Sequence, residues 1–265
     1  MRTDLRESMA IFVPLSRRLW TSIWTVATHA VGLPRIRCPE CGTERLLTFS
    51  CKVRGFCPSC HAKRREDWGE LIREELLLDV PHRQVVFTIP KMLRIFFRFK
   101  RSLLSSLSLA AVHALLEYFT TVSGHELMPG IVAVIQTFGD RINFHPHIHV
   151  LVTEGGTASD GTFHRVCRFH DDLIQALFTR KVFSLLLQEK LIGLPLVEKI
   201  LRWRHTGFSV HTQVKAETKR ETERVGKYMI RPLLSLKRLF LDERGGKVCY
   251  RYSRKGSQEE SMDYP

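Results

Sequence analysis

Three histidines alternate in the segment NFHPHIHVLV and lead directly into a β-branched apolar stretch. His145, His147 and His149 occupy positions i, i+2 and i+4. Successive side chains of a β-strand point to opposite faces of the sheet, so alternate residues share a face. The spacing therefore predicts a strand with imidazoles side by side on one face and aliphatic residues such as Ile148 and Val150 packed into the core on the other.

Two adjacent imidazoles on a rigid strand favour a divalent metal ion. With two or three protein ligands, the ion keeps open positions for a phosphate oxygen, as a Lewis acid for phosphodiester cleavage requires. We predict His147 and His149 as the metal pair, with Mg²⁺ or Mn²⁺ as the ion. His145, which precedes Pro146 and the predicted strand, and Gln136 on the neighbouring predicted strand are alternatives for a third ligand. Histidines that alternate by chance on the surface are the competing interpretation.

A metal-bound phosphate also needs a nucleophile, which a tyrosine can supply. Tyr228 lies near the end of a predicted basic helix that stops before Pro232, and nearby cations attract phosphate. Tyr118 falls in the apolar pattern of its predicted helix, whereas Tyr250 and Tyr252 fit an alternating strand. Tyr228 is therefore the candidate nucleophile, and a tyrosine at the edge of the core is the alternative.

The N-terminal cysteines have the spacing of a structural zinc site. The pairs Cys38-x2-Cys41 and Cys57-x2-Cys60 flank Cys51, in a segment without a long apolar period. Two such pairs in a segment that cannot build its own core predict four thiolate ligands on one Zn²⁺. Cys51 is an alternate ligand and His61 a more distant candidate. Free thiols and a redox C-x-x-C motif are the other interpretations, although the latter needs one pair at a helix start. The remaining two cysteines, Cys167 and Cys249, are predicted to be packed thiols.

Basic residues crowd the cysteine segment and the tyrosine helix. A zinc-stabilised basic module is suited to contact a phosphate backbone, and a solvated charged rim is the alternative. The candidate DNA contacts are Arg54, Lys63, Arg64, Arg65, Lys227 and Arg231.

The charge of the whole chain also points to a polyanionic partner. The 265 residues carry a formal net charge of +14, and the sequence pI is near 9.8. This composition favours nucleic acid first and an anionic membrane second. A membrane span needs about 18 consecutive apolar residues, and the nearest run, residues 10–33, is interrupted by Arg17 and Arg18. We expect no span, no signal peptide and a cytoplasmic protein.

Hydrophobic periodicity predicts mixed helices and strands. Strands are expected at 83–89, 131–138, 146–153 and 163–168, with a loop at 153–161 and a hairpin at 238–253 that turns at Gly245-Gly246. Helices are expected within 1–34 and at 65–79, 100–119, 171–191 and 217–229. The pattern favours an α+β fold, an antiparallel sheet with helices on one side, preceded by a zinc-ribbon or knuckle module. The predicted domains are a helical lead at 1–34, a zinc module at 35–66 and a larger domain at 67–265.

Three segments together resemble a known family. FHPHIHVLVTEGG resembles the His-hydrophobic-His motif of HUH single-strand endonucleases. CPECGTERLLTFSCKVRGFCPSCHAKR is similar to the N-terminal zinc-binding domain of the rolling-circle insertion-sequence transposases within that superfamily. KYMIRPLLSLKRL followed by GKVCYRYSRKG looks like the tyrosine region of the same branch. The motifs occur in the family's order and cover about residues 35–260.

The resemblance implies DNA transposition and recombination through a tyrosine nuclease. In such a reaction Tyr228 would attack single-stranded DNA at the ends of the element and form a 5′-phosphotyrosine, with His147 and His149 as the metal pair. It also implies an HUH-endonuclease-like fold and a bacterial cytoplasmic protein that acts at the nucleoid, with no role for a membrane.

The sequence departs from the family in two respects. Some members carry two tyrosines one helical turn apart, whereas Arg224 and Pro232 occupy the positions four before and four after Tyr228. The chain also stops at SQEESMDYP, where family members continue. We therefore expect a single-tyrosine, truncated copy, and a catalytically silent DNA-binding remnant is the alternative function. A hydrolase of small phosphate esters is a third possibility, which the charge of +14 disfavours.

Overall fold

The structure is a computed structural model that describes residues 35–37, 40–42, 44–46, 58–235, 238–242, 247–252 and 260–264. The chain divides into two compact units. Unit 1 comprises Met1–Trp68, Asp140–Ile142 and Arg231–Pro265, and unit 2 comprises Gly69–Gly139 and Asn143–Ile230. The helix expected within 1–34 lies outside the described residues, and the domain boundaries at 34 and 66 stay a prediction.

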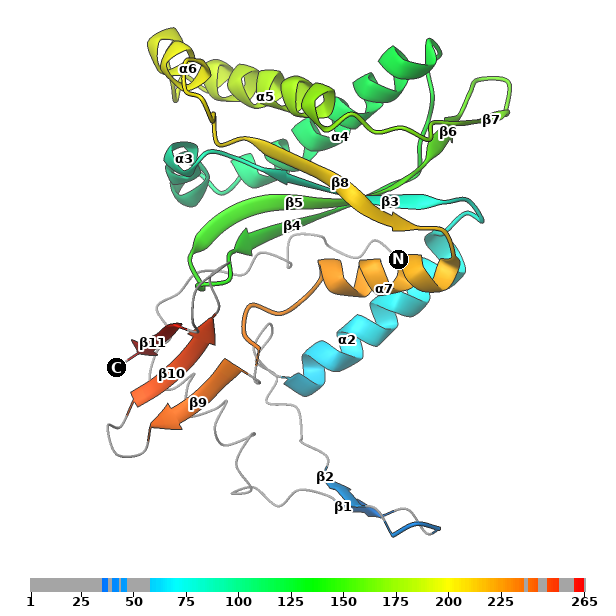
Figure 1. The fold of residues 1–265 in the computed structure, drawn as a ribbon, viewed down its shortest axis with the longest axis vertical. Helices are drawn as coiled ribbons and strands as arrows, with labels where there is room; N and C mark the ends of the chain where they lie inside the picture. The colour runs from blue at the N-terminus through cyan, green and yellow to red at the C-terminus, as the bar shows by residue number, and fades with distance from the viewer. Residues whose placement is uncertain are drawn as a thin grey trace. The chain divides into compact units, whose positions relative to one another are not determined.

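Unit 2 is built on a four-stranded antiparallel sheet with the order β4-β5-β3-β8 (Figure 1). Its strands are β3 (His82–Thr88), β4 (Ile131–Phe138), β5 (Phe144–Thr153) and β8 (Ser209–Ala216). The three strands predicted for this region coincide with β3, β4 and β5. The expected α+β class with an antiparallel sheet and flanking helices is confirmed.

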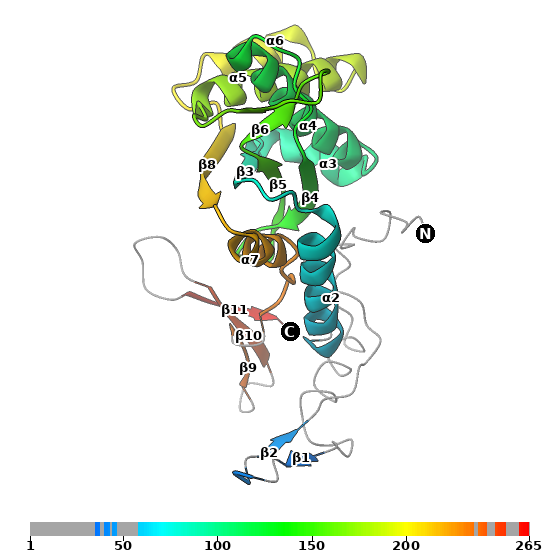
Figure 2. The ribbon, with the colours of Figure 1, turned by 90° about the vertical axis from the view of Figure 1, so that its right-hand side faces the viewer.

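Helices lie on both faces of this sheet (Figures 1 and 2). One face carries α3 (Arg94–Phe99), α4 (Leu103–Ser123), α5 (Asp171–Gln188) and α6 (Leu194–Leu201), together with the short η3 (Lys91–Leu93). The other carries α7 (Lys219–Met229). The expectation of helices on one side is therefore wrong, because α7 contacts β5 and β8 on the second face and the carbonyl oxygen of its Met229 accepts a hydrogen bond from Gln136 of β4.

Helix α4 forms much of the apolar core. Leu104, Leu107 and Leu115 are fully buried, and on the same face Phe87 of β3 meets Phe178 of α5 with ring centroids 4.8 Å apart. Within the described part of the chain, α4 is the one helix long and apolar enough to cross a bilayer, but half of that stretch is buried inside the fold. Core helices of globular domains meet the same length and composition test, so its apolar character fits packing on the sheet.

Two strands of unit 2 were missed because their sequences lack a clear apolar alternation. β8 is an edge strand, and His211, Gln213 and Lys215 are exposed along it, so the pattern HTQVKA does not predict a buried strand. β6 (Gly155–Thr157) lies inside the predicted loop and pairs with β7 (Phe163–Arg165).

Helix α2 (Pro58–Leu71) continues as the π-helical turn η2 (Ile72–Leu76), whereas the sequence predicted one helix at 65–79. The described strands of unit 1 form a β1 (Arg35–Arg37) and β2 (Glu44–Leu46) hairpin and a three-stranded antiparallel sheet. The three-stranded sheet contains β9 (Leu239–Asp242), β10 (Lys247–Tyr252) and β11 (Glu260–Tyr264), which confirms the hairpin expected at 238–253.

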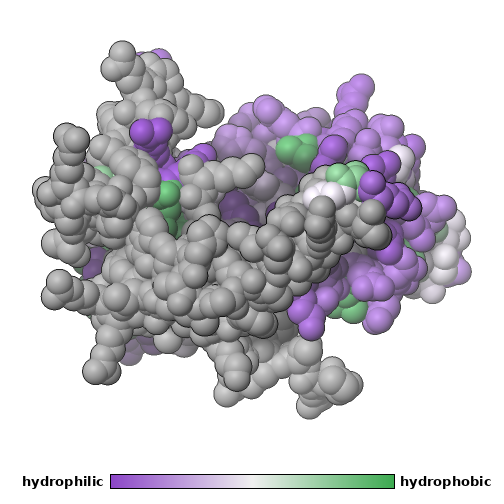
Figure 3. All heavy atoms as spheres, turned by 90° about the horizontal axis from the view of Figure 1, so that it is seen from below, coloured by the Kyte–Doolittle hydropathy of each residue, from purple (hydrophilic) through white to green (hydrophobic). Residues whose placement is uncertain are grey.

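Seen from below Figure 1, the described residues in view are mostly hydrophilic, and apolar side chains appear singly among them (Figure 3).

Candidate active site

The three histidines lie in a row on β5. The strand already begins at Phe144, so His145, which directly precedes Pro146, belongs to the same strand as His147 and His149. The ring centroids of His145 and His147 are 5.2 Å apart, and those of His147 and His149 are 4.9 Å apart. The predicted alternation of imidazoles on one face is therefore present.

Pro146 fits inside this strand because one neighbouring ladder has ended there and the other is irregular. The pairing of β5 with β3 stops at His147, opposite Thr88, and the pairing with β4 is irregular between Gln136 and Phe138. A proline lacks the backbone N–H and is tolerated where no ladder bond is required. The proline therefore does not bend His145 away from the strand.

His147 is held in a defined tautomer by its own strand. Its side chain is 7% exposed, and its Nδ1 lies 2.8 Å from the carbonyl oxygen of His145. A carbonyl only accepts, so Nδ1 carries the proton and Nε2 keeps its lone pair. This arrangement, in which one ring nitrogen donates to a carbonyl and the other can bind a metal, is usual for metal-binding histidines.

His149 is held by Gln84, a residue that the sequence analysis missed. Gln84 lies on β3 and is 6% exposed, and its amide is 3.0 Å from Nδ1 of His149. The amide nitrogen would donate to Nδ1 and leave the proton on Nε2. The reversed amide would accept from Nδ1–H through its oxygen and free Nε2 for a metal. The available signal was a polar residue directly before the apolar run Val85–Phe87 of a predicted strand.

Gln136 stands directly opposite His147 in the β4–β5 ladder. Its side chain is 3% exposed, and its Nε2 donates to the carbonyl oxygen of Met229 at 2.6 Å. Among the described residues, its buried Oε1 has no hydrogen-bond partner. A buried amide oxygen without a partner is costly, and hard divalent cations prefer oxygen ligands. These residues therefore fit a divalent ion bound by His147, His149 and the Gln136 amide oxygen.

Tyr228 lies beside this histidine row. Its ring centroid is 6.2 Å from that of His149, with the two planes at 85°, and the side chain is 51% exposed. The Gln136–Met229 hydrogen bond ties the last turn of α7 to the sheet one residue away from Tyr228. Tyr228, the predicted nucleophile, thus lies beside His149 of the predicted metal pair, although the two are 79 residues apart in the sequence. The Tyr228 side chain is also open to solvent.

Helix α7 is fixed by its start and by one close approach. Thr218 accepts from the backbone N–H of Glu221, whose side chain accepts from the N–H of Thr218, which is a complete capping box. Farther along, a Cβ on Gly226 would come within 2.4 Å of Cδ1 of Ile72 in η2. Only a glycine lets the helix pack this closely, and it stands two residues before Tyr228.

The predicted DNA contacts differ in their surroundings. Lys227 bonds to Glu223 at 2.8 Å, and this contact is the main reason why the pKa of Glu223 is lowered. Arg231 lies 3.8 Å from Asp140 within unit 1. On α2, Lys63, Arg64 and Arg65 are exposed, and Arg65 is 3.7 Å from Glu66. Their contacts with DNA stay a prediction, and Arg54 lies outside the described residues.

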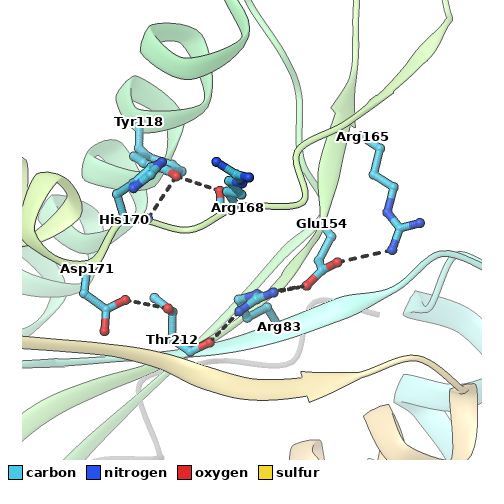
Figure 4. A network of polar contacts seen from close by, with 8 residues as sticks. All are labelled: Arg83, Tyr118, Glu154, Arg165, Arg168, His170, Asp171 and Thr212. Carbon is cyan, nitrogen blue, oxygen red and sulfur yellow. Dashed lines mark hydrogen bonds and ion pairs between the residues drawn. The ribbon is translucent and has the colours of Figure 1, made fainter.

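A second polar cluster lies on the opposite face of the sheet (Figure 4). Arg83 neighbours Gln84 on β3 and bonds to Glu154 and to the carbonyl oxygen of Thr212, each at 2.9 Å. Glu154 is 2% exposed and also faces Arg165 at 3.5 Å. Because a buried charge is costly unless paired, this cluster holds β3, β5 and β8 in register behind the histidine face.

The same cluster reaches the loop before α5. The Tyr118 hydroxyl donates to the carbonyl oxygen of Arg168 at 2.8 Å and accepts from the backbone N–H of His170 at 3.1 Å. Tyr118 is fully buried, as expected for a core residue. Burial raises the pKa of its phenol, which makes it unsuited to act as a nucleophile at neutral pH.

Two protein-family models together match most of the chain. A family model described as "Putative transposase" matches residues 130–264, which contain the histidine row and Tyr228. A second model, described as "Transposase zinc-binding domain", matches residues 7–89. The chain belongs to the IS91-type rolling-circle transposase family.

Two curated relatives agree with this assignment. The transposase for insertion sequence element IS801 of Pseudomonas savastanoi pv. phaseolicola is 27% identical over 253 residues, which are 88% of this chain and 59% of the relative. A protein named "Putative transposase y4qJ" from Sinorhizobium fredii is 33% identical over 155 residues, 57% of this chain and 38% of the relative. The chain thus spans about three fifths or less of these transposases. No solved structure matches it.

The zinc-binding segment of this transposase is described only in part. Cys41 and Cys60 are described, whereas Cys38, Cys51 and Cys57 lie outside the described residues. The matched zinc-binding domain includes all five, so the zinc module is supported and the choice of ligands stays a prediction. Burial and the nearby Arg65 and Arg64 lower the pKa of His61. Of the remaining cysteines, Cys249 is buried as expected, but Cys167 is exposed, so the prediction of a packed thiol is wrong there.

Within the described ranges, no three His, Cys, Asp or Glu side chains converge on a common metal position. His147 and His149 lie side by side on β5, and Gln136 stands opposite His147 on β4. A divalent ion held by two imidazoles and one amide oxygen would keep several coordination positions open to phosphate oxygens.

Proposed function

We propose that this transposase nicks and rejoins single-stranded DNA through a 5′-phosphotyrosine at Tyr228. One observation carries the proposal: Tyr228 of α7 stands against His149 of β5, with ring centroids 6.2 Å apart, at the histidine row that the sequence predicts as a metal site. Neither feature alone is specific. A half-exposed tyrosine is common, and so is a pair of histidines, but their convergence from two distant segments matches the needs of phosphodiester transfer.

Each residue of the row has a distinct role in this proposal. His147 and His149 would bind a Mg²⁺ or Mn²⁺ ion through Nε2, with the Oε1 of Gln136 as the third protein donor. When bound, such an ion supplies Lewis-acid polarisation of the scissile phosphate. His145 contributes mainly its backbone carbonyl, which fixes the tautomer of His147.

The covalent step balances without any further reactant. The Tyr228 Oη attacks phosphorus, so that an Oη–P bond forms while the P–O3′ bond breaks. The phenolic proton passes to solvent, which reaches the half-exposed side chain, and the departing O3′ takes up a proton to become the 3′-hydroxyl. A 3′-hydroxyl that attacks the phosphotyrosine reverses these bonds and rejoins a strand, because one phosphodiester is exchanged for another.

In the cell, this reaction would act on single-stranded DNA at the ends of an insertion sequence. The zinc module and the basic residues Arg54, Lys63, Arg64 and Arg65 would contact the phosphate backbone, and Lys227 and Arg231 would do so near the tyrosine. We place this activity in the bacterial cytoplasm at the nucleoid, with no membrane involved.

The test is the formation of a covalent protein–DNA adduct. The purified chain is incubated with end-labelled single-stranded DNA from its own flanking sequence and with Mg²⁺ or Mn²⁺, and the products are separated on a denaturing gel. We expect an adduct with the wild type and with the control Tyr252→Phe. We expect none with Tyr228→Phe, with His147→Ala/His149→Ala or after addition of a chelator.

Two outcomes would reject the proposal. An adduct that survives in Tyr228→Phe would place the nucleophile elsewhere. Native-gel binding of the same DNA by the wild type, without any adduct, would identify a catalytically silent DNA-binding remnant.

A further inference from the structure

Helix α3 and the residues beside it combine cations with two exposed apolar side chains. The segment KMLRIFFRFKR, residues 91–101, contains five lysines and arginines and no acidic residue. Phe99 is 79% exposed and Ile95 is 53% exposed. Exposed aromatic side chains that are grouped with charges often mark a binding surface, because burying the ring against a ligand is favourable whereas leaving it in water is not.

Two cations of this segment lie over aromatic rings. The guanidinium of Arg98 is 5.9 Å from the ring centroid of Phe99, and that of Arg101 is 5.8 Å from the ring centroid of Phe144. Lys100 is paired with Glu189, the residue after α5. Arg98 and Arg101 place positive charge next to the rings, and we call Arg98, Phe99, Arg101 and Phe144 the α3 platform.

The α3 platform lies at the histidine end of the sheet. Phe144 is the first residue of β5 and directly precedes His145. The last residue of β3, Thr88, is paired with His147, and the chain then passes through Pro90 and η3 into α3. Alternation along β5 places Phe144 on the face opposite to the histidines. A strand held at the histidine row would reach the platform by passing around this end of the sheet (Figures 1 and 2).

We propose that the α3 platform binds single-stranded DNA next to the scissile phosphate, with a base stacked on Phe99 and backbone phosphates on Arg98 and Arg101. This inference rests on the proposed function, since it takes the same strand as its ligand. A base exposes its π-face only when the strand is unpaired, so a stacking ring selects single strands, and arginines beside it neutralise the phosphates. A cationic patch with one prominent ring matches this ligand in charge and in shape.

The first test isolates binding from chemistry. The full-length chain carrying Tyr228→Phe is titrated with a fluorescent single-stranded oligonucleotide from its flanking sequence, and anisotropy is measured. We expect Phe99→Ala to weaken binding on the order of 5- to 100-fold, the range seen when one base loses its aromatic partner. Met128→Ala, a control at a residue 70% exposed, should bind like its parent.

Abasic substitutions then locate the stacked base. Oligonucleotides that each lack one base are titrated against the Tyr228→Phe parent and its Phe99→Ala derivative. One abasic position should weaken binding to the parent and leave the Phe99→Ala affinity unchanged. If the Phe99→Ala loss is the same for every abasic position, the ring does not stack on a base and the inference is wrong.

The arginines are tested through the salt dependence of the same binding. The slope of log K against log salt concentration is negative, and removing two phosphate contacts from a single strand should make it less steep by about 1.4. We expect this change for Arg98→Gln/Arg101→Gln. The control Lys199→Gln/Arg202→Gln, which removes the same charge from α6 and its cap, should leave the slope near that of its parent.

Two results would overturn the inference without touching the proposed function. If Phe99→Ala binds the oligonucleotide with the affinity of its parent, the α3 platform is not a DNA-binding surface. Adduct formation by the wild type would still identify the tyrosine nuclease. Binding to phosphatidylserine vesicles that depends on Phe99, with unchanged DNA binding, would assign the platform to a membrane instead. Conversely, Phe99-dependent DNA binding by a chain that forms no adduct would leave the platform and reject the nuclease.

Discussion

At the scale of single residues, the candidate site depends on which nitrogen of each imidazole carries the proton. The carbonyl of His145 settles this for His147. For His149 the choice falls to Gln84, which can present either its oxygen or its nitrogen to Nδ1. A buried amide that orients a histidine acts as a positioning residue, and such partners typically change metal affinity by 10- to 100-fold.

This role predicts a graded response at Gln84. Gln84→Ala should weaken Mn²⁺ binding about 10- to 100-fold, as measured by calorimetry on the DNA-free chain. Gln84→Glu should retain the affinity, because a carboxylate accepts from Nδ1–H and frees Nε2. The control Gln213→Ala, at an exposed position of β8, should have no effect. Parent-like Mn²⁺ affinity in Gln84→Ala would show that Gln84 does not position His149 for the metal.

The buried ion pair behind the sheet predicts a stability effect. Glu154→Gln leaves Arg83 as a buried charge with a weaker acceptor, so we expect it to destabilise the fold by about 3 to 5 kcal/mol. Arg83→Met/Glu154→Leu, which removes both charges, should cost less than Glu154→Gln alone. Urea unfolding followed by circular dichroism measures both. A double variant that is less stable than the single one would mean that the pair is net stabilising.

At the scale of elements, the position of Tyr228 depends on how closely α7 approaches η2. The missing Cβ of Gly226 permits this approach to Ile72, while the capping box starts the helix at a fixed residue. Helix propensity works against glycine here by about 1 kcal/mol relative to alanine. The presence of glycine at 226 is therefore explained by packing and by the placement of Tyr228.

Gly226→Ala should consequently lower the rate of adduct formation, by roughly 10-fold or more given the sensitivity of catalysis to displacements near 1 Å. The clashing atom is Cδ1 of Ile72, and Ile72→Val removes that atom alone. Gly226→Ala/Ile72→Val should therefore regain much of the rate in a single-turnover adduct assay. A double variant no faster than Gly226→Ala would exclude this contact as the cause.

At the scale of the whole molecule, stability should depend on pH through buried histidine. Burial is the main cause that lowers the pKa of His82, which is 5% exposed at the start of β3. As pH falls below about 6.5, the unfolded chain takes up a proton there and the folded chain does not, so stability declines until pH passes the lower folded value. Stability should therefore rise with pH across this window.

The His82 contribution can be separated by two substitutions that cannot titrate. His82→Gln and His82→Leu should both flatten the rise of melting temperature between pH 5 and 7, although they differ in packing and hence in absolute stability. Thermal unfolding at several pH values measures this. A slope that is unchanged in both variants would assign the pH dependence to other groups.

The local chemistry could be predicted from the sequence. Alternation alone places His147 and His149 on one face of a strand, and the C-x2-C spacing indicates zinc, because each pattern reflects a short-range rule of backbone geometry or ligand spacing. Tyr228 was selected by its basic neighbours in sequence, and the structure brings it to the histidines. Strands β3, β4 and β5 were predicted from their runs of apolar, largely β-branched residues.

Long-range packing decided the rest. Nothing local in HRQVVFT indicates that Gln84 meets His149, since β3 and β5 are joined through α4 and β4. The edge strand β8 pairs with β3, which is distant from it in sequence. Helix α7 covers the second face of the sheet, where Gln136 anchors it through Met229, again a contact between distant segments. The sequence by itself indicated the histidines and the tyrosine that we propose for phosphoryl transfer. The tertiary structure decided their convergence, because that depends on contacts between segments that no short-range pattern encodes.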